Sequence, residues 1–327
     1  MPEGREMVVE IVAKASLKTI AVEEFGGLLR IIRFNAFSEV ANRAARLIVS
    51  QPSQILLIYV MPDWLAIILL GIIEGVTEFL PISSTGHLLI PQNLHWLPQK
   101  SDLFNVVIQS GAVLAVLAVF TGRLKHLAST LGEASTRDYL AKLFAAFFIT
   151  AVGGLIIKKF GIKLPETIPP VAWATLIGGF IILILEFLHK DKAGTANITW
   201  TVVVAVALAQ LLAAVFPGTS RSGASILMAL AFGVSRPAAT EFSFLLGIPT
   251  LMAAGAFKIL SAIKDGEAGN EDWGMVILGT VVSAVFAFIV VKWLIRFVQG
   301  HTFNGFAWYR IALGTGLLVW VYNGGGN

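Results

Sequence analysis

The sequence predicts an all-α polytopic membrane protein built from two inverted repeats, each with a re-entrant helix pair and three transmembrane helices. Three observations lead to this fold class. The composition is strongly apolar, the apolar segments have the length of membrane helices, and their order along the chain occurs twice.

Composition identifies the solvent. Of 327 residues, 56% are hydrophobic and 13% are charged, whereas soluble domains carry about 25% charged residues. The mean hydropathy is +0.80. Charges and turn formers divide the sequence into apolar segments of roughly the 17–25 residues that a helix needs to cross a bilayer core. The chain has no cysteine, which excludes disulfides and thiolate chemistry.

Residues 1–60 differ from the rest, because they hold seven Lys/Arg and six Asp/Glu and no apolar run of spanning length. They also lack the pattern of a signal peptide. One interpretation is a membrane-surface helix that includes the amphipathic piece Phe25–Phe34. The other, which we favour, is an extension upstream of the true start, because Met61–Trp64 leads directly into the first apolar helix. Deletion of residues 1–60 should then leave activity intact. The membrane domain is predicted at 61–327.

The first repeat, about 64–188, begins with two short helices, Trp64–Leu80 and Thr85–Leu94, joined at Pro81–Ser84. Pro81 ends the first helix, since proline lacks the N–H and disfavours helical geometry in the preceding residue. Each helix is too short to span comfortably, so we expect a re-entrant pair. Spanning helices are expected at about 104–121, 139–157 and 171–188.

The second repeat, about 201–322, has the same order. Thr201–Phe216 leads into the turn Pro217–Ser225 and a short helix that ends at Phe232. Spanning helices are expected near 240–260, 274–295 and 306–322. Gln210 precedes Pro217 by seven residues, as Glu74 precedes Pro81. Three crossings per repeat would invert the second repeat, which brings the two turns together near the bilayer midplane.

Polar side chains gather at these turns. Glu74 and Glu78 lie one helical turn apart and share a face. A charge at the centre of a membrane helix costs about 2.5–3.5 kcal/mol and by default marks a functional site. The candidates from the first turn are Glu74, Glu78, Ser83, Ser84, Thr85 and His87, and those from the second are Ser220, Arg221, Ser222 and Ser225.

Arg221 indicates a phosphate site, because Arg binds phosphate bidentately and the N-terminus of the following helix offers free N–H groups. Two carboxylates would repel that anion unless a divalent cation lay between them, so Glu74 and Glu78 predict an Mg²⁺ or Ca²⁺ site. His87 can transfer protons near neutral pH. Ser84 or Thr85 could be a nucleophile.

Structural interpretations of the same residues are also open. Glu74 and Glu78 could be protonated and hydrogen-bonded inside the bundle, the serines and glycines could serve close helix packing, and a lone His87 could be structural. We expect Glu186 and Arg310, near predicted helix ends, to extend toward the interface and take no part in the site.

The motifs EGVTEFLPISSTGH (Glu74–His87) and PGTSRSGAS (Pro217–Ser225) resemble those of the undecaprenyl-diphosphate phosphatases, also called bacitracin-resistance proteins. The resemblance covers the chain from Met61 to its end. It implies ten helices, six of them spanning, in a bacterial plasma membrane. It also implies release of phosphate from a C55 polyprenyl diphosphate, which regenerates the lipid carrier of cell-wall synthesis and gives bacitracin resistance.

The resemblance gives catalytic importance to Glu78, Ser84, His87 and Arg221. The substrate-binding candidates are Ser83, Thr85, Ser220, Ser222 and Ser225, the last at a position where the family usually has threonine. We expect metal-assisted phosphoryl transfer, with either Ser84 or water as the attacking group. The alternative function is a polyprenyl-phosphate transporter, since inverted repeats with broken helices are a transporter architecture.

The expected partners are the polyprenyl diphosphate and the lipid bilayer, with no nucleic acid, and a homodimer is left open. One set of loops carries seven Lys/Arg and the other five. The positive-inside rule therefore makes the first set cytoplasmic and places both termini outside. The resemblance implies an active site that also opens outward.

Overall fold

The computed structural model describes residues 61–161, 167–189 and 194–324. The predicted extension, residues 1–60, lies outside these ranges. Regular structure in the described part is helical, apart from a single parallel bridge between Thr195 and Val234. The all-α fold class is therefore confirmed.

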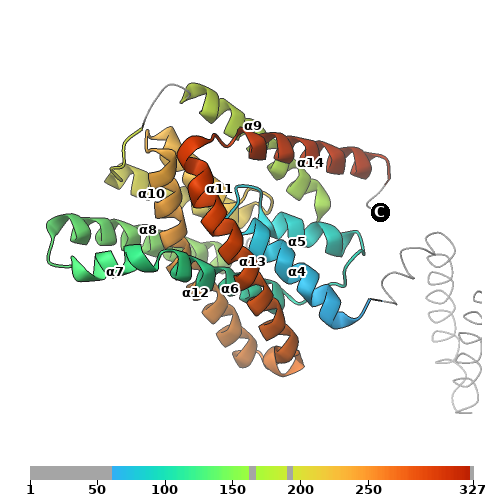
Figure 1. Ribbon diagram of the computed structural model, residues 1–327. Coiled ribbons are helices and arrows are strands. Elements are labelled where there is room, and N and C mark those ends of the chain that lie inside the picture. Colours follow the sequence, from blue (N-terminus) through green and yellow to red (C-terminus); the bar gives the residue numbers. More distant parts are fainter. Residues whose placement is uncertain (1–60, 162–166, 190–193, 325–327) are drawn as a thin grey trace, which may run out of the picture. The chain divides into compact units, whose positions relative to one another are not determined.

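The first half contains the predicted helix pair and three long helices (Figure 1). Their bounds are α4 (Asp63–Thr77), α5 (Ser84–Asn93), α6 (Asp102–Val119), α7 (Thr121–Ser129), α8 (Ala134–Lys159) and α9 (Ile168–Leu188). The short helix α7 was not predicted. It lies in the polar stretch between two spanning segments, where hydropathy gives no helix signal.

The second half has the same order of a short pair followed by three long helices. Its elements are α10 (Trp200–Val215), α11 (Arg221–Ala231), α12 (Arg236–Lys264), the 3₁₀ turn η1 (Glu267–Asn270), α13 (Trp273–Gly300) and α14 (Asn304–Tyr322). The breaks between α4 and α5 and between α10 and α11 fall at the two predicted turns. Inversion of one repeat relative to the other stays a prediction.

Five described helices are long and apolar enough to cross a membrane, namely α6, α8, α9, α12 and α13. α14, predicted from the sequence as a sixth span, is not in this group. Arg310 lies within it and lowers its hydropathy. The protein is a multi-pass membrane protein.

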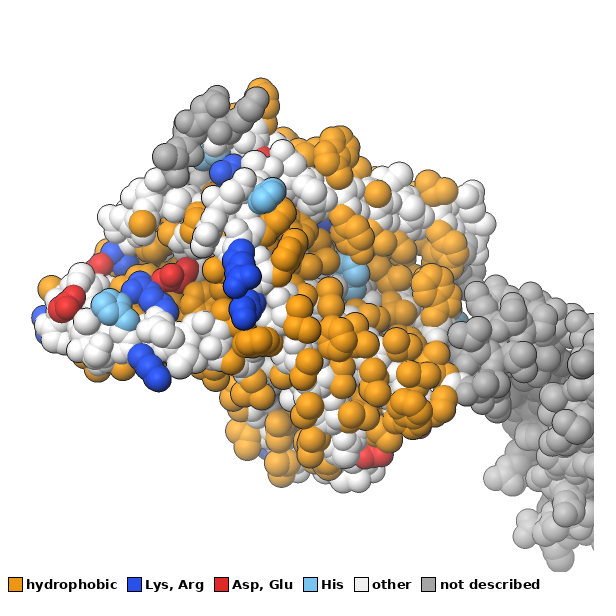
Figure 2. Space-filling model, in the orientation of Figure 1, with side chains coloured by type: hydrophobic (Ala, Val, Ile, Leu, Met, Phe, Trp, Pro, Cys, Tyr) orange, Lys and Arg blue, Asp and Glu red, His pale blue; other side chains and the backbone are white. Residues whose placement is uncertain are grey.

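The outer surface fits an apolar solvent. Large hydrophobic side chains such as Phe144 and Phe148 on α8 are more than half exposed, at 53% and 59%. Figure 2 shows hydrophobic side chains over most of the face formed by α4 and α13, while charged side chains gather at the end that holds α7.

α4 carries Glu74, is followed directly by its C-cap residue Glu78, and packs closely against α13. Glycine makes the approach possible, because a Cβ atom added at Gly71 would lie 2.8 Å from the carbonyl oxygen of Gly279. At Gly75 an added Cβ would clash with the backbone of Ser283. A larger residue at either position would displace the helix that positions Glu74 and Glu78.

Candidate active site

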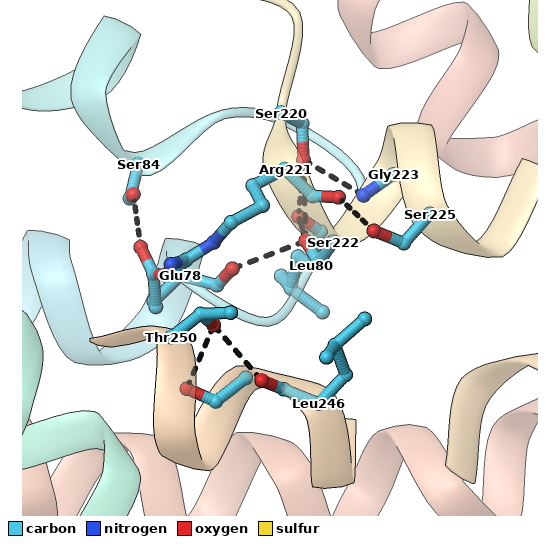
Figure 3. Close-up of polar contacts among 11 residues, drawn as sticks. Glu78, Leu80, Ser84, Ser220, Arg221, Ser222, Gly223, Ser225, Leu246 and Thr250 are labelled. Carbon is cyan, nitrogen blue, oxygen red and sulfur yellow. Dashed lines mark hydrogen bonds and ion pairs between the residues drawn. The ribbon is translucent and has the colours of Figure 1, made fainter. Parts of the chain in front are cut away.

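The two turns lie against each other. The hydroxyl of Ser220 is 3.2 Å from the carbonyl oxygen of Leu80. The hydroxyl of Ser222 lies 3.0 Å from the backbone carbonyl oxygen of Leu80 and 3.1 Å from the backbone carbonyl oxygen of Glu78, so its proton is shared between two acceptors. Figure 3 shows both serines directed at the first turn. The predicted meeting of the two turns is confirmed.

The two turns also share a local geometry. Ser83 and Ser220 both have positive φ, 76° and 70°, and each caps the helix that follows. The Ser83 hydroxyl accepts from the Gly86 N–H at 3.2 Å, and the Ser220 hydroxyl accepts from the Gly223 N–H at 3.1 Å. Such caps satisfy N–H groups that a helix start leaves unpaired.

Gly218 explains a difference in spacing between the turns. One residue separates Pro81 from its helix cap Ser83, but two residues separate Pro217 from Ser220. Gly218 has a φ of 99°, and an added Cβ would lie 2.6 Å from the Val171 carbonyl oxygen. The extra residue of the second turn must therefore be glycine.

The centre of the site is the carboxylate of Glu78. One of its oxygens accepts a hydrogen bond from the Ser84 hydroxyl, and the other pairs with the guanidinium of Arg221. Figure 3 shows the Arg221 side chain extending from the second turn toward Glu78. The Glu78 side chain is 5% exposed and that of Arg221 is 27% exposed, so the Arg221 guanidinium can reach a ligand from outside. This cluster joins three of the four predicted catalytic residues.

Glu74 lies one turn before Glu78 and is fully buried. Neither of its carboxylate oxygens has a hydrogen-bond partner among the described residues. An ionised carboxylate is costly to bury without a cation or hydrogen bonds. The unpartnered oxygens beside Glu78 therefore fit a divalent cation.

The described residues include no group of three or more His, Cys, Asp or Glu that could hold a metal ion. Glu74 and Glu78 would supply two carboxylates, and the other ligands would be water and phosphate oxygens. Mg²⁺ is usually bound in this way, through one or two carboxylates together with substrate phosphates. Both Glu78 oxygens already bind Ser84 and Arg221, so only Glu74 has unpartnered carboxylate oxygens, and the cation stays a prediction.

His87 uses both ring nitrogens within the described structure. Nδ1 lies 2.7 Å from the Ser83 carbonyl oxygen, which can only accept, so Nδ1 donates. In the neutral ring Nε2 then accepts from the hydroxyl of Tyr309, 2.7 Å away. The rings are stacked, with centroids 5.7 Å apart. His87 is thus directed to α14 rather than to Ser84.

The other predicted substrate-binding residues differ in position. Thr85 is exposed, whereas Ser225 is buried and donates to the Arg221 carbonyl oxygen at 2.9 Å within α11. Ser220 and Ser222 join the turns, as described above. Their part in substrate binding stays a prediction.

The expectation that Arg310 extends to the interface is wrong. Arg310 is 1% exposed, and its guanidinium donates to the carbonyl oxygens of both turns. The acceptors are Pro81 at 3.0 Å, Gly218 at 2.9 Å and Thr219 at 3.2 Å, together with Ala174 at 3.1 Å and Thr175 at 3.2 Å on α9. The broken helices leave carbonyl groups unpaired in an apolar region, and Arg310 satisfies them.

The same expectation for Glu186 is also wrong. Glu186 is 4% exposed, and both carboxylate oxygens bind the guanidinium of Arg236. It also accepts from the Phe303 N–H at 2.8 Å. Because α12 and α14 cover the end of α9, this carboxylate is enclosed and links the three helices.

Two further polar residues, Gln210 and Ser243, lie at the site and were not predicted from the sequence as site residues. A small cavity beside Glu78 and Arg221 is also lined by Gln210 and Ser243. The Gln210 side-chain oxygen is buried and has no hydrogen-bond partner among the described residues. The spacing that aligns Gln210 with Glu74 was the available signal.

Comparison with known proteins gives one family and relatives that share one name. The family model described as "Bacitracin resistance protein BacA" matches residues 67–316. An undecaprenyl-diphosphatase of Rhizobium etli is 50% identical over 263 residues, which cover 80% of this chain and 98% of the relative. An undecaprenyl-diphosphatase of Xylella fastidiosa is 51% identical over 255 residues, 78% of this chain and 97% of the relative. One from Xanthomonas oryzae pv. oryzae is 49% identical over 262 residues, 80% and 98% respectively.

Proposed function

The chain belongs to the bacitracin resistance protein BacA family, and on that premise we propose that it is an undecaprenyl-diphosphatase. It hydrolyses undecaprenyl diphosphate to undecaprenyl phosphate and inorganic phosphate. This reaction recycles the lipid carrier of cell-wall synthesis and gives resistance to bacitracin. The observation that carries the proposal is the Glu78 carboxylate, which binds Ser84 from the first turn and Arg221 from the second.

Arg221 holds the terminal phosphate. Its guanidinium has five N–H donors in a planar fork that matches phosphate oxygens. One nitrogen is used by Glu78, and donors remain for the substrate. The partial exposure of Arg221 beside buried Glu78 supports this role, because the guanidinium can reach a phosphate from outside. Substrate binding and activation of the nucleophile thus share one carboxylate.

Ser84 is the proposed nucleophile, because its hydroxyl donates to Glu78, which can take the proton. The serine oxygen bonds to the terminal phosphorus as the bond from phosphorus to the bridging oxygen breaks. Undecaprenyl phosphate leaves, and water then cleaves the phosphoserine to release inorganic phosphate. In the alternative path, water takes the place of Ser84 in a single step, with Glu78 as the base.

His87 is proposed as the residue that transfers protons to and from this site. Two hydrogen bonds hold its neutral ring. Nδ1–H donates to the Ser83 carbonyl oxygen, and Nε2 accepts from the Tyr309 hydroxyl. The imidazole can therefore act only after the bond from Tyr309 is exchanged for one to substrate or water.

Glu74 and Glu78 would hold the proposed divalent cation, Mg²⁺ or Ca²⁺. When bound, it would neutralise negative charge on the phosphate oxygens. The two unpartnered oxygens of Glu74 support this assignment.

We also propose that both termini lie outside a bacterial plasma membrane, as the Lys/Arg distribution between loops favours, and that the site opens to the same external side, as the family resemblance implies. Reporter fusions after Asn327 should behave as external, and cytoplasmic behaviour would overturn the assignment. A homodimer is a further prediction, which cross-linking of the protein in native membranes would test.

The test of the function is a phosphate-release assay on purified protein in detergent. With no membrane to cross, a transporter has no reaction to perform, whereas the phosphatase should release phosphate from undecaprenyl diphosphate. Release that requires Arg221 and Ser84 is the expected result. No release with any divalent cation would favour the transport function for the same phosphate-binding site.

A further inference from the structure

A groove of about 350 Å³ lies beside the site, between α13 and α14. Its volume falls within the roughly 300–1,000 Å³ of typical small-molecule sites. Its walls are apolar or aromatic and consist of Ile82, Trp293, Phe297, Gly305, Phe306 and Tyr309.

Two residues of the groove wall connect it to the first turn and to His87. Ile82 belongs to the first turn, between Pro81 and the capping residue Ser83. Tyr309 lines the groove with its ring and donates through its hydroxyl to His87. A ligand that lies along this groove therefore ends next to the His87 imidazole and the first turn.

The aromatic wall is fixed by its own packing. The rings of Trp293 and Phe297 are stacked with centroids 5.0 Å apart, and Phe306 meets them edge-on at 6.3 Å and 5.7 Å. Such contacts favour a defined ring arrangement. The floor is open at Gly305, where an added Cβ would meet no atom within 4 Å.

We propose that this groove holds the isoprenoid chain of the substrate where the chain joins the diphosphate. The inference rests on the proposed function, because only a substrate with an apolar chain has a group to place there. A chain that leaves the first turn at Ile82 would pass along the groove and out between α13 and α14 into the bilayer.

The groove acts on orientation more than on affinity. Lipid tails are as apolar as the groove, so transfer of the chain from bilayer to protein releases little hydrophobic free energy. Contact with fixed aromatic rings instead limits the positions of the first isoprene units, and thereby of the attached diphosphate. Misplacement of a reacting group by about 1 Å can cost on the order of a hundredfold in rate.

The test is to fill the groove with Gly305→Trp. The matched control is Gly316→Trp, on the same helix and also with no atom within 4 Å of an added Cβ, but not part of the groove wall. Gly305→Trp should lower kcat/KM for undecaprenyl diphosphate by at least about tenfold. Inhibition by inorganic phosphate, which occupies only the head-group site, should stay within about twofold of the original protein. Gly316→Trp should change neither value.

Unchanged kcat/KM in Gly305→Trp would show that ordinary bilayer lipid covers the groove, and would overturn the inference. A matching loss of phosphate inhibition would also overturn it, because the substitution would then act on the head-group site. If the unmodified protein releases no phosphate, the proposed function fails instead.

A second measurement applies if Gly305→Trp does not fold. A polyprenyl diphosphate with a photoreactive group on its first isoprene units is cross-linked to the unmodified protein in detergent. Labelling within residues 293–309, suppressed by excess undecaprenyl diphosphate, is expected. Competed labelling confined to other helices would contradict the inference.

Discussion

The guanidinium of Arg310 occupies the space that a side chain at Gly178 would fill. A Cβ atom added at Gly178 would lie 2.6 Å from Cζ of Arg310, which its five carbonyl partners hold in place. We therefore expect Gly178→Ala to lower the free energy of unfolding by about 1–3 kcal/mol, as overpacking does, and to reduce turnover. Gly154→Ala on α8, where an added Cβ meets nothing within 4 Å, is the control and should be near neutral.

Arg310→Lys tests the same contacts from the other partner. Lysine keeps the charge but concentrates its donors at one atom, so it cannot reach carbonyl oxygens on both turns and α9. Each buried carbonyl left without a donor costs about 1–3 kcal/mol. The variant should unfold at a lower temperature in detergent and lose most of its turnover. Activity and stability equal to the original protein would mean that the turns hold their positions without Arg310.

Arg221→Lys tests the phosphate fork. The positive charge remains, but a point charge cannot bind Glu78 and two phosphate oxygens together. We expect turnover to fall on the order of a hundredfold with membrane insertion unchanged. Arg123→Lys is the control, because Arg123 is paired with Glu241 at a partly exposed surface and should change turnover less than about twofold.

Glu74→Gln tests the cation. The substitution keeps the shape of the side chain but removes a charge from the proposed ligand pair. Chelation should abolish phosphate release by the unmodified protein, and Mg²⁺ should restore it. Glu74→Gln should need at least about tenfold more Mg²⁺ for half-maximal rate. Loss of a residue that only hydrogen-bonds to a metal ligand already changes metal affinity by about 10–100-fold, and Glu74 is proposed as a ligand itself. An unchanged Mg²⁺ requirement would remove Glu74 from the ligand set. Glu241→Gln, at the surface pair, serves as control.

Rapid quench tests the nucleophile. If Ser84 attacks, a phosphoserine should accumulate in the first turnover, at a peptide that contains residue 84. The Ser84→Ala protein should show neither the phosphopeptide nor significant phosphate release. Failure to trap the species in a fully active preparation would favour attack by water, with Ser84 as a hydrogen-bond donor to Glu78.

Residue order alone was enough to predict the helix pairs and the meeting of the two turns. The reason is that a proline followed by hydroxyl residues ends a helix and caps the next one, a local effect that Ser83 and Ser220 display. Glu78 and Arg221 could be named because charge is rare in apolar segments. Ser84 was named as a hydroxyl of the first turn and through the resemblance.

Arg310 and Glu186 could have been found by the same rule, but their proximity to predicted helix ends was given more weight. Hydropathy does not distinguish an arginine that extends to the interface from one that faces the bundle interior. Tyr309 had no local signal, because its contact with His87 joins residues 222 positions apart. The helix-packing partners that decide such cases are set by tertiary structure.

The position of Arg310 in α14 has a consequence for biosynthesis. The carbonyl groups that it binds, at Pro81, Gly218 and Thr219, are all made earlier on the ribosome. Chains fold and insert from the amino end during synthesis, so both turns enter the membrane before Arg310, which binds carbonyl groups of both turns, is made. A nascent or prematurely terminated chain that ends before α14 would hold every predicted catalytic residue and still lack a fixed arrangement of them. We therefore expect full competence for catalysis only after α14 has left the ribosome and Arg310 has reached the two turns.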